Sequence, residues 1–118
     1  MTDMHPALSP WQFGTGTMRF NDMSVTASVP YDAGDQASLT SDIARNGITS
    51  PISIKREKGQ SMIIQGHHRR RGARSLGMES GPVNVKYRGD DVGTTQDLKP
   101  ISEDEYHKNM SKPSWVER

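Results

Sequence analysis

A chain of 118 residues, of which 31% are hydrophobic, is long enough for one small core and too short for two. Its net charge of +1 implies neither nucleic-acid nor membrane binding, so local clusters of charge are more informative than the total. The absence of cysteine excludes disulfides, thiolate zinc sites and a cysteine nucleophile, and it is compatible with a reducing compartment.

We expect a cytoplasmic protein that does not enter a membrane. The sequence shows no basic segment followed by an apolar stretch at its start, and no apolar run long enough to cross a bilayer. Compact proteins of a single domain are common in phages and mobile elements, and size alone suggests such an origin.

Residues 1–22 predict an irregular segment, because prolines and glycines interrupt any sustained period. Its aromatic side chains are expected to pack on the core or on a partner protein: Trp11, Phe13 and Phe20. Loose alternation of apolar residues then predicts a strand over residues 23–29 that ends at Pro30.

Residues 35–46 predict the first helix, with Leu39 and Ile43 one turn apart and Gly47 as a left-handed stop. Pro51 begins a second strand over residues 52–55. The polar residues 56–60 then predict a hairpin turn that leads into a third strand over residues 61–64.

A second helix is predicted after Gly66, running to Leu76 and ended by Gly77. Alternation over residues 82–87 predicts a final strand. Residues 89–118 read as a polar tail with one short helix, because the four residues from Ser102 resemble a capping box. The elements together predict a small α+β domain with a mixed sheet and two main helices.

A cluster of cations at the start of the second helix is the most informative feature of the chain. The first N–H groups of a helix lack intrahelical partners and carry partial positive charge, so they favour anions. Here they are joined by arginines that we expect to be exposed, which makes the junction at Gly66 a candidate phosphate site. These are Arg69, Arg70, Arg71 and Arg74.

Two sequence boxes, in this order and spacing, resemble the N-terminal domain of the ParB and sulfiredoxin superfamily over residues 23–88. The first box is Gly47-Ile48-Thr49-Ser50-Pro51-Ile52. The second is Gly66-His67-His68-Arg69-Arg70-Arg71-Gly72. It has histidines at the two positions where chromosome-partitioning members usually have glutamate and arginine.

This resemblance implies a pocket for a nucleotide such as CTP, formed by the two boxes. Arg69 and Arg71 would bind the phosphates, helped by the backbone of Gly66 and His67. Thr49 and Ser50 would face the base or the ribose. The remaining candidates of the two boxes are Gly47, Pro51, His68 and Arg70.

The same resemblance narrows the activity. Sulfiredoxin-like reductases carry a catalytic cysteine where this chain has His67, so that activity is excluded. After Tyr87 we find no helix-turn-helix or dimerisation segment, so we do not expect a complete partitioning protein.

Three kinds of function remain open. A binding module would take the phosphates of a nucleotide or of a nucleic-acid backbone. A nuclease or a nucleotide-using phosphotransferase would need Mg²⁺ and a carboxylate, for which the spacing names no residue among Asp35, Asp42, Glu57, Asp90 and Asp91. A protein-interaction adaptor would keep only the fold, with Trp115 suited to a protein contact.

Simpler interpretations stand beside these. The arginines could form a solvated helix face, and the glycines could serve only as helix ends. Adjacent histidines do not share a helical face, so His67 and His68 predict no metal site.

Overall fold

Five strands form one mixed sheet in the computed structural model, which describes residues 11–25 and 33–111. They are β1 (Gln12–Arg19), β2 (Ile52–Glu57), β3 (Gln60–Gln65), β4 (Ser80–Tyr87) and β5 (Gln96–Ile101). Their order across the sheet is β3-β2-β4-β1-β5. The pair β2 and β4 is parallel, and the other neighbours are antiparallel.

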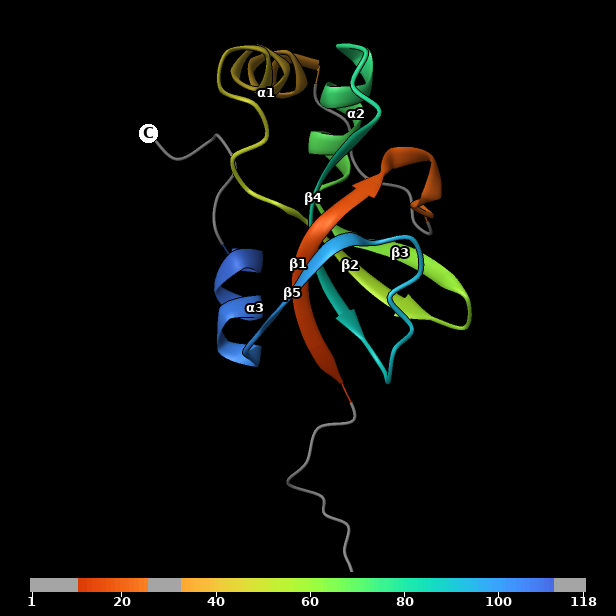
Figure 1. The fold of residues 1–118 in the computed structure, drawn as a ribbon. Coiled ribbons are helices and arrows are strands. Elements are labelled where there is room, and N and C mark those ends of the chain that lie inside the picture. Colours follow the sequence, from red (N-terminus) through yellow and green to blue (C-terminus); the bar gives the residue numbers. More distant parts are fainter. Residues whose placement is uncertain (1–10, 26–32, 112–118) are drawn as a thin grey trace, which may run out of the picture.

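Three α-helices accompany the sheet: α1 (Ala33–Asn46), α2 (His67–Ser75) and α3 (Glu103–Ser111). The helices α1 and α2 pack together beyond one end of the sheet, whereas α3 lies against strands β1, β2 and β4 (Figure 1). A short 3-10 turn, η1 (Phe20–Asp22), follows β1. The predicted α+β class with a small mixed sheet is confirmed.

Local signals in the sequence are confirmed where they are strongest. Gly47 ends α1 with a φ of 73°, and its N–H donates to the carbonyl of Ile43 at 2.8 Å. Lys58 and Gly59 form the hairpin turn between β2 and β3, both at positive φ. The short helix predicted from Ser102 is α3, and its capping hydroxyl accepts the N–H of Glu105 at 3.1 Å.

The prediction of an irregular segment at residues 1–22 was wrong for residues 12–19, which form β1 between β4 and β5. Its glycines, which suggested turns, instead allow β5 to approach closely. A Cβ atom on Gly14 would lie 2.7 Å from Leu98 Cδ1, and one on Gly16 would lie 2.5 Å from the carbonyl oxygen of Gln96.

Residues 82–87 are not the final strand, because β5 follows within the segment predicted as a polar tail. This edge strand is mostly exposed, with Leu98 packed against the core, so it lacks the alternation that identifies a strand in sequence. Its backbone is also irregular: Asp97 has a φ of 55°, and the pairing with β1 shifts register between Thr15 and Thr17.

The strand predicted at residues 23–29 reduces to one bridge between Ser24 and Met62 among the described residues. Residues 26–30, including its predicted end at Pro30, lie outside the described residues.

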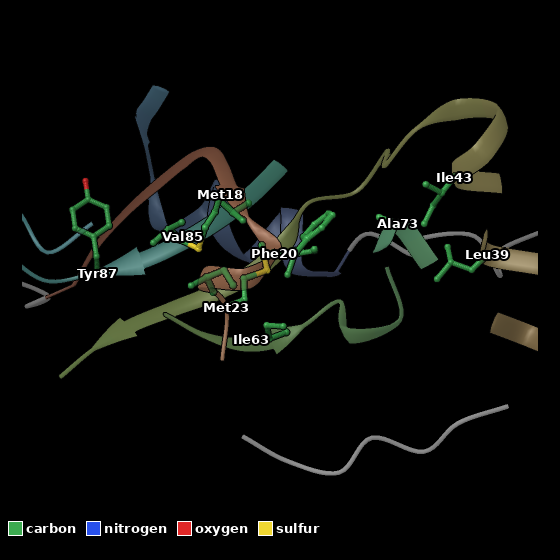
Figure 2. Packing of buried hydrophobic residues seen from close by; sticks show 12 residues of the cluster. Met18, Phe20, Met23, Leu39, Ile43, Ile63, Ala73, Val85 and Tyr87 are labelled. Atoms are coloured by element: carbon green, nitrogen blue, oxygen red, sulfur yellow. The ribbon is translucent and has the colours of Figure 1, made fainter. Parts of the chain in front are cut away.

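Apolar side chains from the sheet, η1, α1 and α2 form one core (Figure 2). Phe20 is 1% exposed and lies between the strands and the helices. The α3 face of the sheet is held by polar contacts as well: the Asn84 amide donates to the carbonyl of Tyr106 at 3.0 Å and accepts from the Asn109 amide at 3.3 Å. Burial raises the pKa of the Tyr106 hydroxyl to about 12.

Within residues 11–25 and 33–111, no helix combines the length and the apolar character needed to span a bilayer.

The close approach of β5 predicts the effect of adding one methyl group. We expect Gly16→Ala to lower the free energy of unfolding by about 1–3 kcal/mol, because the new Cβ meets backbone that cannot move without unpairing β5. Urea denaturation measures this, with the exposed Gln12→Ala as the control in the same strand. Equal stability of the two variants would show that β5 packs less tightly on β1 than described.

Candidate functional site

A left-handed glycine opens α2 and sets its first turn against β2. Gly66 has a φ of 108° and provides no side-chain cap for the helix. A Cβ atom there would lie 3.1 Å from Ile52 Cα, so both conformation and space favour glycine. The N–H groups of His67, His68 and Arg69 therefore form an uncapped helix start beside β2.

Arg69 joins the two sequence boxes. Its Nη1 donates to the carbonyl of Pro51 at 2.9 Å, whereas its Nε has no hydrogen-bond partner. The residue is only 6% exposed, so the expectation of an exposed arginine was wrong here. Burial lowers the pKa of the Arg69 guanidinium, yet an arginine keeps its proton in proteins. The structure thus places a buried cation with unused hydrogen-bonding capacity between the boxes.

The first box and Arg69 enclose a narrow crevice. It is lined by Gly47, Thr49, Ser50 and Arg69, with Asp42 of α1 at its side. The crevice has no room for a water-sized sphere. Ser50 is buried, and Thr49 is exposed. The predicted residues of the first box therefore do meet the second box, and they meet it through Arg69.

In the second box, His68 and Arg70 contact other parts of the fold. His68 contacts α1, where its Nδ1 lies 3.0 Å from the Gln36 side-chain oxygen. Arg70 donates from Nε to the carbonyl of Phe20 at 3.1 Å. Arg71 is exposed, one helical turn after His67, so these two residues share a helix face. A ligand at the start of α2 would thus meet His67 and Arg71 on one side and Arg69 on the other.

The surroundings of His67 favour the neutral form of its imidazole. Burial lowers the pKa of its imidazole below the ordinary 6.5, and the nearby charges of His68, Arg70 and Arg71 act in the same direction. Its Nε2 is buried without a hydrogen-bond partner. An anion placed here would oppose the effect of the neighbouring cations and favour the protonated imidazole.

A larger hollow lies on the other side of the first box. Its cavity volume is about 350 Å³, and it shares Ile48 and Thr49 with the crevice. Asp97 and Lys99 of β5 line it, together with Thr15, Thr17 and Pro51. The size is within the range of small-molecule sites, ~300–1,000 Å³. Sequence reasoning missed Asp97 and Lys99 because it did not predict β5. The sequence provides little signal for this strand, because its residues are mostly polar and exposed.

The described residues contain no group of three His, Asp or Glu side chains that could hold a metal ion. Mg²⁺ needs less than this, because it commonly binds through one or two carboxylates together with phosphate oxygens. Asp42, which lines the crevice beside Arg69, is the carboxylate best placed for such a role. Its Oδ1 accepts a hydrogen bond from the Asn46 amide at 2.9 Å and keeps further acceptor capacity.

Comparisons with known proteins identify the fold. No family model and no curated protein matches the sequence. Among solved structures, the C-terminally truncated chromosome-partitioning protein ParB from Caulobacter crescentus, complexed with CTP-gamma-S, is 20% identical with a TM-score of 0.57. This match covers 65% of the present chain and 46% of that chain, so the chain spans less than half of that ParB structure.

Two further structures have the same fold. Sulfiredoxin from Arabidopsis thaliana is 16% identical with a TM-score of 0.57, and the match covers 60% of this chain and 82% of that chain. A free serine kinase in complex with AMP is 19% identical with a TM-score of 0.53, covering 61% of this chain and 30% of that chain. The chain therefore has the fold shared by ParB N-terminal domains and sulfiredoxin.

The burial of Arg69 predicts a structural cost on its removal. We expect Arg69→Ala to lower the free energy of unfolding by about 1–3 kcal/mol, because the Pro51 carbonyl loses its partner and the side chain leaves a void. Urea denaturation measures the change, with the exposed Arg45→Ala as the control. If both variants are as stable as the parent, Arg69 is solvated rather than buried.

Proposed function

We propose that this chain, which has the ParB N-terminal and sulfiredoxin fold, is a module that binds a phosphate-bearing ligand at the start of α2, with a nucleotide such as CTP as the preferred class. The contact between Arg69 and Pro51 carries the proposal, because it brings a buried cation and the first box to one place. The ParB structure complexed with CTP-gamma-S and the free serine kinase in complex with AMP support a nucleotide on this fold.

The phosphates would bind at the uncapped N-terminus of α2. The first N–H groups and the helix dipole favour negative charge there, and His67 and Arg71 share the adjoining helix face. The crevice is closed, so Arg69 would reach a phosphate only if the loop of residues 47–51 opened. The free Nε of Arg69 provides a donor for that purpose.

The base and sugar would occupy the 350 Å³ hollow beside Thr49. Pro51 lines this hollow and also accepts the hydrogen bond from Arg69, so the two subsites are neighbours. Asp97 would accept hydrogen bonds from sugar hydroxyls or a base amino group, and Lys99 and the threonine hydroxyls would complete the polar lining.

A nucleic-acid backbone is the alternative ligand at the same helix start. The Caulobacter crescentus ParB was also solved complexed to the centromeric parS site. Phosphate contacts of this kind would position DNA without reading its sequence.

Turnover is a second candidate function, favoured by the carboxylates on either side of Thr49. Asp42 lines the crevice and Asp97 lines the hollow. In a nucleotide-using phosphotransferase, Asp42 would hold Mg²⁺ at the phosphates. The hydroxyl acceptor, in place of the base and sugar, would then occupy the hollow, where Asp97 would accept its proton. A nuclease would need the same Mg²⁺ and carboxylate, and no contact among the described residues favours it over the phosphotransferase.

Calorimetric titration with CTP, ATP, GTP and a short DNA duplex, each with and without Mg²⁺, tests the binding proposal. We expect one nucleotide to bind and Arg71→Gln to weaken it about tenfold or more, because a charge-assisted hydrogen bond to phosphate is lost. Arg45→Gln removes the same charge from an exposed position at the end of α1, so it should bind as the parent does.

The alternatives give different results. If the duplex binds and no nucleotide does, the ligand of this site is a nucleic-acid backbone. If neither binds, a protein-interaction adaptor is the remaining function. Transfer of a phosphoryl group from a nucleoside triphosphate to an added hydroxyl acceptor, dependent on Mg²⁺ and lost in both Asp42→Asn and Asp97→Asn, would establish the phosphotransferase.

His67 predicts a pH dependence of binding. Its pKa in the free protein lies below 6.5, and a bound phosphate raises it, so affinity should increase as the pH falls from about 7.5 to 6. The phosphate of the ligand also titrates near this pH range. The His67→Gln variant keeps the effect of the phosphate on affinity and lacks the effect of His67, so it serves as the control. The parent should therefore gain more affinity than His67→Gln, and NMR should show the His67 resonance titrating at higher pH in the complex. Parallel pH profiles for the two proteins would remove His67 from the site.

A further inference from the structure

Three cationic side chains converge on one tryptophan at the end of the sheet away from α2. The Arg88 Cζ atom lies 4.1 Å from the centre of the Trp11 ring, the Lys86 Nζ atom 4.8 Å and the Lys55 Nζ atom 5.5 Å. We call these four residues the Trp11 cluster. Attraction between cations and an indole face holds such groups together.

The sheet itself forces two of the cations together. Lys55 of β2 and Lys86 of β4 are directly opposed in the parallel pairing, so they share one face of the sheet. Like charges in this position repel each other and destabilise a sheet. The Trp11 ring lies near both lysines and offsets part of this repulsion.

One carboxylate contacts the cluster among the described residues. Glu57 lies 3.1 Å from Lys55 Nζ, and this contact is the main cause of a lowered pKa for its carboxyl, with Arg88 and Lys58 also contributing. The nearby Asp91 is committed to Arg56 through an ion pair. Within the part of the chain that the structure describes, neither Lys86 nor Arg88 forms an ion pair with a carboxylate, and Arg88 acts on Glu57 only from a longer distance. The cluster therefore keeps an excess of positive charge.

We propose that the Trp11 cluster is a nucleic-acid contact that binds the phosphate backbone, separate from the phosphate site at the start of α2. Arginine and lysine side chains beside an aromatic ring are the usual elements of surfaces that bind single strands. Arg88 is exposed and the other three residues are half-buried, so the cluster lies at the surface of the molecule. An acidic peptide would use the cations alone, so the tryptophan favours nucleic acid.

The cluster and the α2 site are distinct places on the molecule. Gly66 meets Ile52 at one end of β2, and Lys55 lies three residues further along the strand. At 3.3 Å per residue the two positions are about 10 Å apart along β2. A nucleotide bound at α2 would leave the Trp11 cluster accessible.

Tryptophan fluorescence provides a direct test. The chain has two tryptophans, so Trp115→Phe leaves Trp11 as the only reporter. We expect an oligothymidylate strand to change the Trp11 emission and to bind with a salt dependence of log K on log salt of about −2, since three cations each contribute about −0.7. A short duplex and polyglutamate of similar charge serve as the comparison ligands.

Charge-matched variants locate the contact. In the same background, Lys86→Gln and Arg88→Gln should each weaken oligothymidylate binding several-fold and make the salt slope about 0.7 less steep. Arg45→Gln removes an equal charge elsewhere and should bind as the parent does. Lys86→Gln loses the contact with Trp11 and also relieves the repulsion with Lys55, so its thermal midpoint should stay close to that of the parent, which separates lost binding from lost folding.

Four results would overturn the proposal: no binding of either nucleic acid, no change in Trp11 emission on binding, equal loss in Arg45→Gln, or polyglutamate binding as tight as oligothymidylate. Binding of the nucleotide at α2 should be the same in the Lys86 and Arg88 variants as in the parent. Failure of the Trp11 cluster would thus leave the α2 proposal intact, and failure of the α2 site would leave this one intact.

Discussion

The contact between the start of α2 and the first residues of β2 determines where everything else in this protein lies. Gly66 can bring the helix against Ile52 because it has no Cβ and adopts a left-handed conformation. Arg69 then fixes the contact through the carbonyl of Pro51. Burying a cation costs free energy, and the hydrogen bond to Pro51 offsets part of that cost.

The same junction explains how α1 is positioned. Gly72 of α2 allows the two helices to approach so closely that a Cβ atom there would lie 2.9 Å from Thr40 Oγ1. Gln36 completes the contact by donating to the carbonyl of His68 at 3.1 Å. The loop that follows α1 is thereby held over Arg69, and both the crevice and the neighbouring hollow result from this placement.

Sequence reasoning predicted helix ends correctly, because a helix end depends on one residue and its near neighbours in the chain. Gly47 ends a helix, Gly66 begins one and Ser102 caps one, and each signal depends only on near neighbours. It failed where tertiary contacts decide. Gly14 and Gly16 suggest turns in sequence, yet their role is to admit a neighbouring strand. Arg69 looks like any exposed cation, and only the packing of α2 on β2 buries it. Asp97 and Lys99 gain a place in the site from a strand that has no apolar alternation.

The position of β1 between β4 and β5 has a consequence for how the protein is made. This strand is synthesised before the other four, yet it pairs with β4 and β5, which come last in the chain order of the strands. The hairpin of β2 and β3 and the pair of helices α1 and α2 involve nearer segments and can form first. The sheet can close only after Ile101 has been released, so this domain is expected to complete its folding only after β5 has been synthesised.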